Sequence, residues 1–252
     1  MKTIALVLLS FGCGCFLALV ASGRSPVNDL HITSARGRAS QEISEYIASH
    51  KVRKLQIGSG QNSINGWLNT DIEPTKDQVY LDASTAFPIP PDSFDYIFAE
   101  QLIEHLTLDQ GQAMLRECYR ILRPGGKVRL ATPNVTTLAK FFVNKSDSDR
   151  HYLGLQTKHD KLSILTTPEC NVMNLEMHAF GHRYLYDADS LRAVVSAAGF
   201  QNVEMAELSI SKDAALSGID GHAQSVASSS GVSFKDADEM VRYISMVVEA
   251  SK

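Results

Sequence analysis

Leu55-Gln56-Ile57-Gly58-Ser59-Gly60 is an apolar strand that runs into a glycine turn, and it opens the stretch that decides the fold. Two more short strands follow, and each ends in an acid: Asp71 after the first and Asp82 after the second. Phe94-Asp95-Tyr96-Ile97-Phe98-Ala99-Glu100 has the pattern of a fourth strand. Strands that alternate with helical or loop segments build a parallel α/β sheet, which holds its ligand at the carboxyl ends of its strands. The sequence therefore predicts such a sheet.

The rest of the chain supplies helices and three more strands. Thr107 and Gln110 form a capping-box pattern, and apolar residues then recur at helical spacing until Pro124-Gly125-Gly126 ends the helix. Residues 127–132 are the next strand, and Asp187 caps a second clear helix. Residues 202–208 and 244–250 are also strand-like, with a Gly/Ser-rich excursion between them. We expect an α/β, Rossmann-like, doubly wound seven-strand sheet, mostly parallel with an antiparallel last strand.

Composition narrows the class of protein. The chain has 252 residues, 44% hydrophobic and 21% charged, which suits one globular α/β domain. A formal net charge of -4 without a Lys/Arg run argues against a nucleic-acid partner. The four cysteines follow no zinc or disulfide pattern.

The N-terminus is apolar almost throughout, from Ile4 to Ser22. That length exceeds the roughly 7–15 residues of a signal-peptide core and approaches the roughly 20 that cross a bilayer. We divide the chain into an anchor or signal segment at 1–22, a polar linker at 23–40 and a catalytic domain at 41–252. Because Arg24, Arg36 and Arg38 follow the apolar segment, an anchor would leave the domain in the cytoplasm. Export after signal cleavage is the alternative.

The glycine turn lets the backbone pass close beneath a ligand, because a Cβ at Gly58 or Gly60 would crowd it. A dinucleotide fingerprint needs a third glycine where this chain has Ser63, which counts against a pyrophosphate cofactor. Asp71 could accept both hydroxyl hydrogens of a ribose, and Ala83 beside Asp82 could offer its amide to a purine edge. Either aspartate could instead serve only its own turn.

Together these residues resemble the class I S-adenosylmethionine-dependent methyltransferases, in particular the type 11 group. The resemblance covers about Leu55 to Asn134, and its most specific parts are Phe94-Asp95-Tyr96-Ile97, Glu104-His105-Leu106 and Leu122-Arg123-Pro124-Gly125-Gly126. It implies S-adenosylmethionine as the cofactor, with the glycine turn under the methionine part, Asp71 on the ribose and Asp82 on the adenine amine. The cofactor-binding residues that we expect are Gly58, Ser59, Gly60, Asp71, Asp82, Ala83 and Glu100.

One departure from that family lies between Gly60 and Asp71. The family usually places a helix of several turns there, whereas this chain has only residues 61–70, interrupted by Gly66-Trp67. A subgroup of predicted methyltransferases has a similar shortened pattern. Trp67 is interpreted as a core residue rather than a cofactor platform.

The sequence assigns no catalytic residue, although a general base is needed when the acceptor must lose a proton. Candidates are Glu104, His105, His178 and His182. Some small-RNA and quinone-precursor methyltransferases hold a divalent metal on a Glu-x-x-Glu-His motif and a later histidine. Here the corresponding run is Gln101-Leu102-Ile103-Glu104-His105, with His182 as the candidate for the later histidine. Gln101 replaces the first acid, and a neutral amide is a poorer ligand for a hard cation. We therefore expect no metal.

The main hypothesis is a methyltransferase that acts on a small, lipid-linked or membrane-proximal acceptor, which would bind between the strand ends and residues 133–186. One alternative is a membrane-tethered, non-catalytic protein that keeps the fold to bind a partner. Another is an NAD(P)-dependent reductase, which Ser63 disfavours.

Overall fold

The computed structural model describes residues 26–143, 145–159 and 166–252. Its centre is a seven-stranded sheet in the order β3-β2-β1-β4-β5-β7-β6. The first five strands in this order pair in parallel, and β7 pairs antiparallel with both β5 and β6. This confirms the predicted sheet with its reversed last strand. The strands are β1 (Lys54–Ile57), β2 (Leu68–Asp71), β3 (Val79–Tyr80), β4 (Phe94–Glu100), β5 (Leu122–Pro133), β6 (Gln201–Ala206) and β7 (Ser245–Ser251).

Chain order around the sheet reverses between β1 and β4. From β1 the chain steps outward to β2 and β3, whereas from β4 it steps the other way to β5. Apolar side chains of both strands are buried, including Leu55 and Ile57 in β1 and Ile97 and Phe98 in β4. In open α/β sheets, ligands bind in the crevice outside the carboxyl ends of strands at such a reversal. The glycine turn after β1 and Glu100 at the end of β4 flank that crevice.

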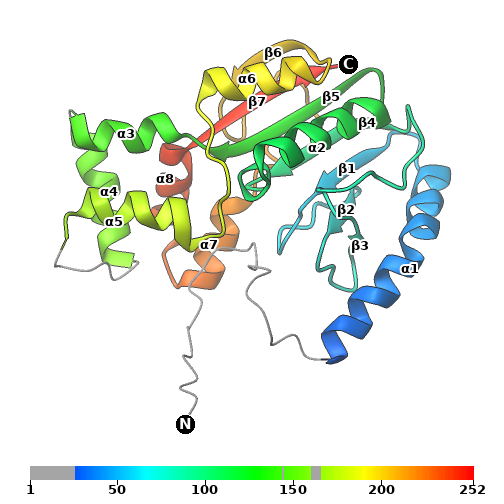
Figure 1. Cartoon of the computed structure of the whole chain (residues 1–252), viewed down its shortest axis with the longest axis horizontal. Helices are drawn as coiled ribbons and strands as arrows, with labels where there is room; N and C mark the ends of the chain where they lie inside the picture. Colours follow the sequence, from blue (N-terminus) through cyan, green and yellow to red (C-terminus); the bar gives the residue numbers. More distant parts are fainter. Residues whose placement is uncertain (1–25, 144, 160–165) are drawn as a thin grey trace.

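Helices α2 (Leu108–Ile121) and α6 (Ala188–Ala197) cover one face of the sheet (Figure 1). Each begins with a capping box, from Thr107 to Gln110 in α2 and from Asp187 to Ser190 in α6. Both caps were predicted. The glycines after α2 do not form a separate loop, because Leu122 already pairs with Phe94 and starts β5 five residues before the predicted strand.

Helix α1 (Pro26–Ser49) lies beside β3 at the edge of the sheet (Figure 1). It begins well before Gln41, inside the segment 23–40 that was predicted to be a linker. Ala35, Ala39 and Ile43 are buried at every fourth position, so one face of the helix packs on the domain. Two of these three side chains are small, which explains why this segment lacks a strong amphipathic pattern.

A helical layer covers the carboxyl ends of β4 and β5 (Figure 1). It consists of η1 (Ile103–His105), α3 (Val135–Val143), α4 (Asp147–His159), α5 (Pro168–Asn174), the π-helical turn η2 (Leu175–Ala179), α7 (His222–Ser230) and α8 (Phe234–Ile244). A second apolar core joins Leu138, Phe141, Tyr152, Val172 and Met240 within this layer. Helices α7 and α8 replace the Gly/Ser-rich excursion predicted between the last two strands.

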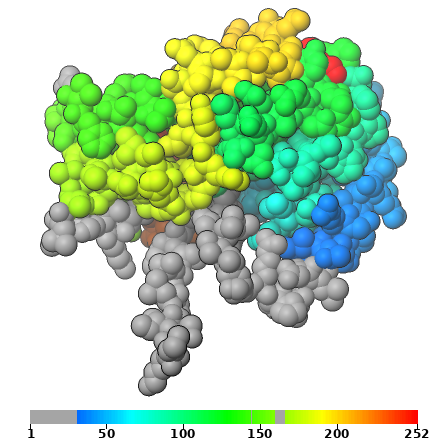
Figure 2. Space-filling model, viewed as in Figure 1, coloured from blue at the N-terminus to red at the C-terminus, as the bar shows by residue number. Residues whose placement is uncertain are grey.

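The segment between η2 and α6 connects the helical layer to the sheet. In the space-filling view it is the yellow region between the green helices α3 to α5 and the part of the molecule around α2 (Figure 2). Backbone hydrogen bonds fix it, because Arg183 N and Tyr184 N both donate to Glu104 O, at 2.7 and 3.2 Å. The chain around residue 182 is therefore held against η1.

The predicted segment 1–22 lies outside the described residues. Within residues 26–143, 145–159 and 166–252, no helix has both the length and the apolar character needed to span a membrane. The short passage after the glycine turn has no helix either, since residues 61–67 form turns and bends. Trp67 is buried there against Phe98 and Leu216, which confirms that it is a core residue.

Candidate functional site at the carboxyl ends of the strands

The glycine turn has the left-handed backbone that its sequence predicts, with φ of 67° at Gly58 and 50° at Gly60. A Cβ on Gly58 would lie 2.8 Å from Leu102 Cδ1, so the Leu102 side chain would have to shift to admit one. Ser59 is buried, and its amide donates to Thr70 O at 2.9 Å. This hydrogen bond holds the turn against β2. Because Gly58 and Gly60 have no side chains, a ligand can approach the backbone of the turn closely.

Asp71 ends β2, and its carboxylate reaches the glycine turn. Asp71 Oδ2 accepts from Gly60 N at 2.9 Å, and Oδ1 accepts from Glu73 N at 2.9 Å. Each oxygen keeps a further acceptor position, because a carboxylate has about four lone-pair sites. Asp71 therefore stabilises its own turn, and its carboxylate can still accept hydrogen bonds from a ligand beside Gly60.

Asp82 is engaged within its own turn. Its Oδ1 accepts from both the amide and the hydroxyl of Ser84, at 2.9 and 2.7 Å. Ala83 beside it is buried. These contacts match the turn interpretation, and the adenine contact of Asp82 and Ala83 remains a prediction.

A small cavity of about 10 Å³ lies beneath the glycine turn. Three buried polar atoms that line it have no hydrogen-bond partner among the described residues: Gln56 Oε1, Glu100 Oε1 and Ser225 Oγ. The other oxygen of Glu100 accepts from Gly221 N at 2.8 Å. Burial raises the pKa of Glu100 to about 7. The cavity therefore offers two acceptors and a hydroxyl to a donor group such as an ammonium.

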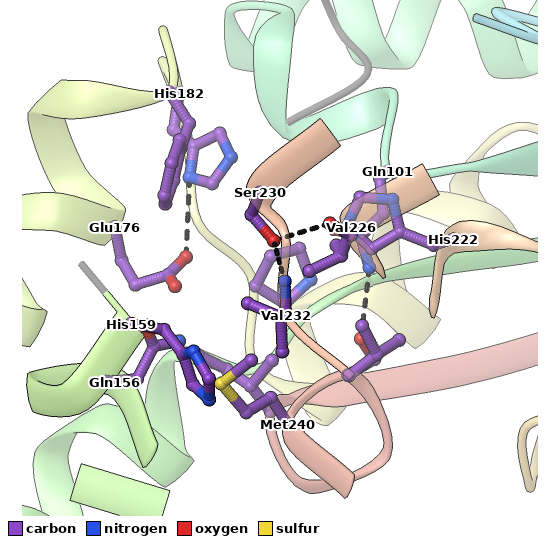
Figure 3. A pocket seen from close by; sticks show the side chains of 15 residues that line it. Gln101, Gln156, His159, Glu176, His182, His222, Val226, Ser230, Val232 and Met240 are labelled. Atoms are coloured by element: carbon purple, nitrogen blue, oxygen red, sulfur yellow. Dashed lines mark hydrogen bonds and ion pairs between the residues drawn. The ribbon is translucent and has the colours of Figure 1, made fainter. Parts of the chain in front are cut away.

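A second and larger cavity, of about 80 Å³, adjoins the first beneath the helical layer (Figure 3). Gln101 and His222 line both cavities. The wall of the larger one also carries His159, Glu176 and His182, together with apolar side chains such as Met240. A small polar molecule placed there would touch histidine and carboxylate groups on several sides.

Two of these histidines are neutral at pH 7. Burial lowers the pKa of His182 to about 4, and burial together with the nearby His182 lowers that of His222 to about 4. A neutral imidazole can accept a proton from a bound molecule, which a charged one cannot. His182 and His222 are therefore two groups of this cavity that can serve as a base.

The structure brings together the three predicted base candidates Glu104, His105 and His182. One ligand-type atom of each lies within 4.8 Å of those of the other two. Glu104 is fully buried, burial raises its pKa to about 8, and its Oε2 accepts from Thr132 Oγ1 at 2.9 Å. Burial lowers the pKa of His105 to about 4. The fourth candidate, His178, is exposed and lies apart from this group.

Sequence reasoning missed several residues of the site. His222 and Ser225 lie on α7, inside the segment that was predicted to be a Gly/Ser-rich excursion. Gln56 gave a usable signal, since it is a polar residue in the middle of an apolar strand.

Arg129 was also missed. Its fully buried guanidinium donates to Asp220, Glu249 and two backbone carbonyls. It thereby fixes the segment that leads into Gly221 and His222 to the sheet.

Comparison with known proteins supports the family suggested by the motifs. Residues 37–130 match the sequence model of a family described as "Methyltransferase domain". A protein of Mycolicibacterium smegmatis named as a probable S-adenosylmethionine-dependent methyltransferase is 46% identical over 52 residues. That match covers 21% of this chain and 20% of the relative, so the chain spans about a fifth of its length.

Solved structures of methyltransferases are also similar at low identity. An S-adenosylmethionine-dependent methyltransferase from Archaeoglobus fulgidus is 16% identical, with a TM-score of 0.45, over 89% of this chain and 99% of that one. One from Mesorhizobium loti is 13% identical, with a TM-score of 0.45, over 86% and 98%. Neither the reductase nor the membrane-tethered alternative gains support. Over residues 37–130 this chain is therefore similar to the methyltransferase-domain family, in agreement with the resemblance that the motifs indicate.

Proposed function

We propose that the protein transfers a methyl group from S-adenosylmethionine to a small-molecule acceptor. The observation that carries this proposal is the placement of the glycine turn and Asp71 at the chain reversal between β1 and β4, inside the segment that matches the methyltransferase domain. The unpartnered Gln56 Oε1 and Glu100 Oε1 fit the methionine ammonium, which donates three hydrogens. Asp71 fits the ribose hydroxyls.

S-adenosylmethionine would supply an electrophilic methyl group on its sulfonium, and the residues of the protein would hold that group in place for the transfer. The cavity beneath the glycine turn has about 10 Å³, close to what one water needs. Gly221 and Ser225 close it, through the Gly221 amide bound to Glu100 and through the Ser225 hydroxyl in its wall. Cofactor binding therefore requires the start of α7 to move away from the turn.

The larger cavity is the place for the acceptor, because it adjoins the glycine-turn cavity through Gln101 and His222. Methyl transfer is an in-line displacement, so alignment of the two molecules and exclusion of water supply much of the rate. An acceptor that must lose a proton can give it to the neutral ring of His222 or His182. Of the predicted candidates Glu104, His105 and His182, only His182 lines this cavity.

The test is a turnover assay on the full-length protein with S-adenosylmethionine and panels of small amines, carboxylic acids and phenols. We expect S-adenosylhomocysteine to form with at least one panel, together with a methylated acceptor detected by mass spectrometry. His222→Asn should lower kcat for that acceptor, whereas His151→Asn, at an exposed site on α4, should not. A protein that binds the cofactor and methylates no acceptor would refute the proposal in favour of the non-catalytic alternative.

A further inference from the structure

A carboxylate and two imidazoles meet beside the larger cavity, at Glu104, His105 and His182. Their ligand-type atoms lie within 4.8 Å of one another, and the two rings have centroids 4.9 Å apart. Glu104 and His105 come from η1, directly after β4, whereas His182 comes from the segment that is hydrogen-bonded to Glu104 O. The main chain therefore brings the three side chains to one point.

Each of the three side chains has a buried polar atom that finds no hydrogen-bond partner among the described residues. These atoms are Glu104 Oε1, His105 Nε2 and His182 Nδ1. Glu104 has no exposed surface, and leaving a buried carboxylate oxygen unpartnered is costly. Glu176 Oε2 lies 3.8 Å from His182 Nδ1, which is beyond hydrogen-bond distance. One cation at this point would satisfy the cluster.

We propose that Glu104, His105 and His182 bind a divalent transition-metal ion, with Zn²⁺ as its best match. Two imidazole nitrogens and one carboxylate suit zinc and its neighbours, whereas Mg²⁺ and Ca²⁺ prefer all-oxygen sites. This departs from the expectation based on Gln101. The Gln101 side chain donates to Ser245 Oγ, and the three proposed ligands do not include the position of the replaced acid.

Supporting contacts of the kind found around metal ligands are also present. The backbone of Gly181 lies near the His105 ring and the backbone of Glu176 near that of His182, and each favours the protonated ring. Glu104 Oε2 is held by Thr132. Such second contacts orient the ligand atoms toward the ion.

Zinc bond lengths of about 2.0–2.2 Å put tetrahedral ligand atoms roughly 3.4 Å apart, so spacings within 4.8 Å must contract by at most about 1.4 Å. Three protein ligands leave a fourth position open. Because His182 lines the larger cavity, that position would be next to the molecule bound there. The metal site does not depend on the proposed methyl transfer, so either can fail alone.

The experiment uses the full-length protein, freed of metal with a chelator and titrated with Zn²⁺ by calorimetry and with Co²⁺ by visible absorption. We expect one Zn²⁺ per chain and the absorption bands of four-coordinate Co²⁺. His182→Asn and Glu104→Gln should each weaken Zn²⁺ binding at least tenfold. The matched control is His178→Asn, four residues away and exposed, which should bind as the wild type does.

Circular dichroism of each variant shows whether it is folded. The Co²⁺ spectrum of the wild type tests the metal site without any variant. The proposal is overturned if the wild type binds no Zn²⁺ at one per chain. It is also overturned if folded His182→Asn and Glu104→Gln bind Zn²⁺ as tightly as the His178→Asn control. In either case the three side chains form a metal-free polar cluster.

Discussion

Arg129→Met should destabilise the protein by about 4 kcal/mol, because it removes the cation from a buried network. The Arg129 side chain is completely buried, and it donates to Asp220 at 2.6 and 3.1 Å and to Glu249 at 2.5 Å. Its remaining bonds go to the carbonyls of Glu207 and Ile210, at 2.9 and 3.1 Å. The side chain of Asp220 is only 3% exposed, so water cannot replace the guanidinium there.

The expected loss of stability comes from the buried carboxylates that Arg129→Met leaves without their cation. Removing one partner of a buried ion pair costs about 3–5 kcal/mol, which is a large share of the roughly 5–15 kcal/mol that stabilises a typical domain. Glu249 is 18% exposed and can regain part of its hydration, which keeps the expected loss near the middle of that range. The segment before Gly221 should also loosen, so cofactor binding should weaken.

The assay is urea unfolding followed by the fluorescence of Trp67, the single tryptophan, which packs on Leu216 in the same segment. Arg129→Met/Asp220→Asn should recover part of the loss, because it removes the stranded charge as well. Arg123→Met is the control, since the Arg123–Asp95 pair is partly exposed and should contribute under about 1 kcal/mol. A loss below about 1 kcal/mol for Arg129→Met, or no recovery in the double variant, would refute the reasoning.

Three further predictions test other parts of the structure. Burial raises the pKa of Glu100 from 4.5 to about 7, so its stabilising contribution is complete below pH 4.5 and is lost as the pH rises through 7. Between pH 5 and 8 the wild type should lose up to about 3 kcal/mol more unfolding free energy than Glu100→Gln, and parallel pH curves would contradict this. Gly58→Ala should lower the stability by about 1–2 kcal/mol in thermal unfolding, because the residue is left-handed and a Cβ meets Leu102, whereas Gly37→Ala, in open space on α1, should not lower it. Thr107→Ala should lose about 1 kcal/mol with the α2 cap and Thr107→Ser should keep most of it, so equal stability of the two variants would count against the cap.

Many of the strands and helices could be predicted from residues that are close together in the sequence. The strand ends at Asp71 and Glu100 were visible because each follows a run of strand-forming residues. The caps at Thr107 and Asp187 were visible because capping uses residues only three positions apart. These features depend on neighbours in the sequence, which is why these strands and helices could be predicted.

Features of the structure that depend on contacts between distant parts of the chain were not predicted. Helix α7 (His222–Ser230) contains four serines and lies between Gly221 and Gly231, so its sequence does not favour a helix without the packing of Ala223. His222 could therefore not be placed at the site. Nor could spacing along the chain show that Glu104 meets His182, since backbone bonds from the segment after Gly181 make that contact.

The central claim is that S-adenosylmethionine or its product binds across the glycine turn with Asp71 on the ribose. Calorimetric titration of the full-length protein with S-adenosylhomocysteine tests this most directly. We predict binding at one per chain, weakened at least tenfold by Asp71→Ala and unchanged by Asp77→Ala, an exposed aspartate six residues further on. No binding by the wild type, or equal binding by the two variants, would contradict the assignment.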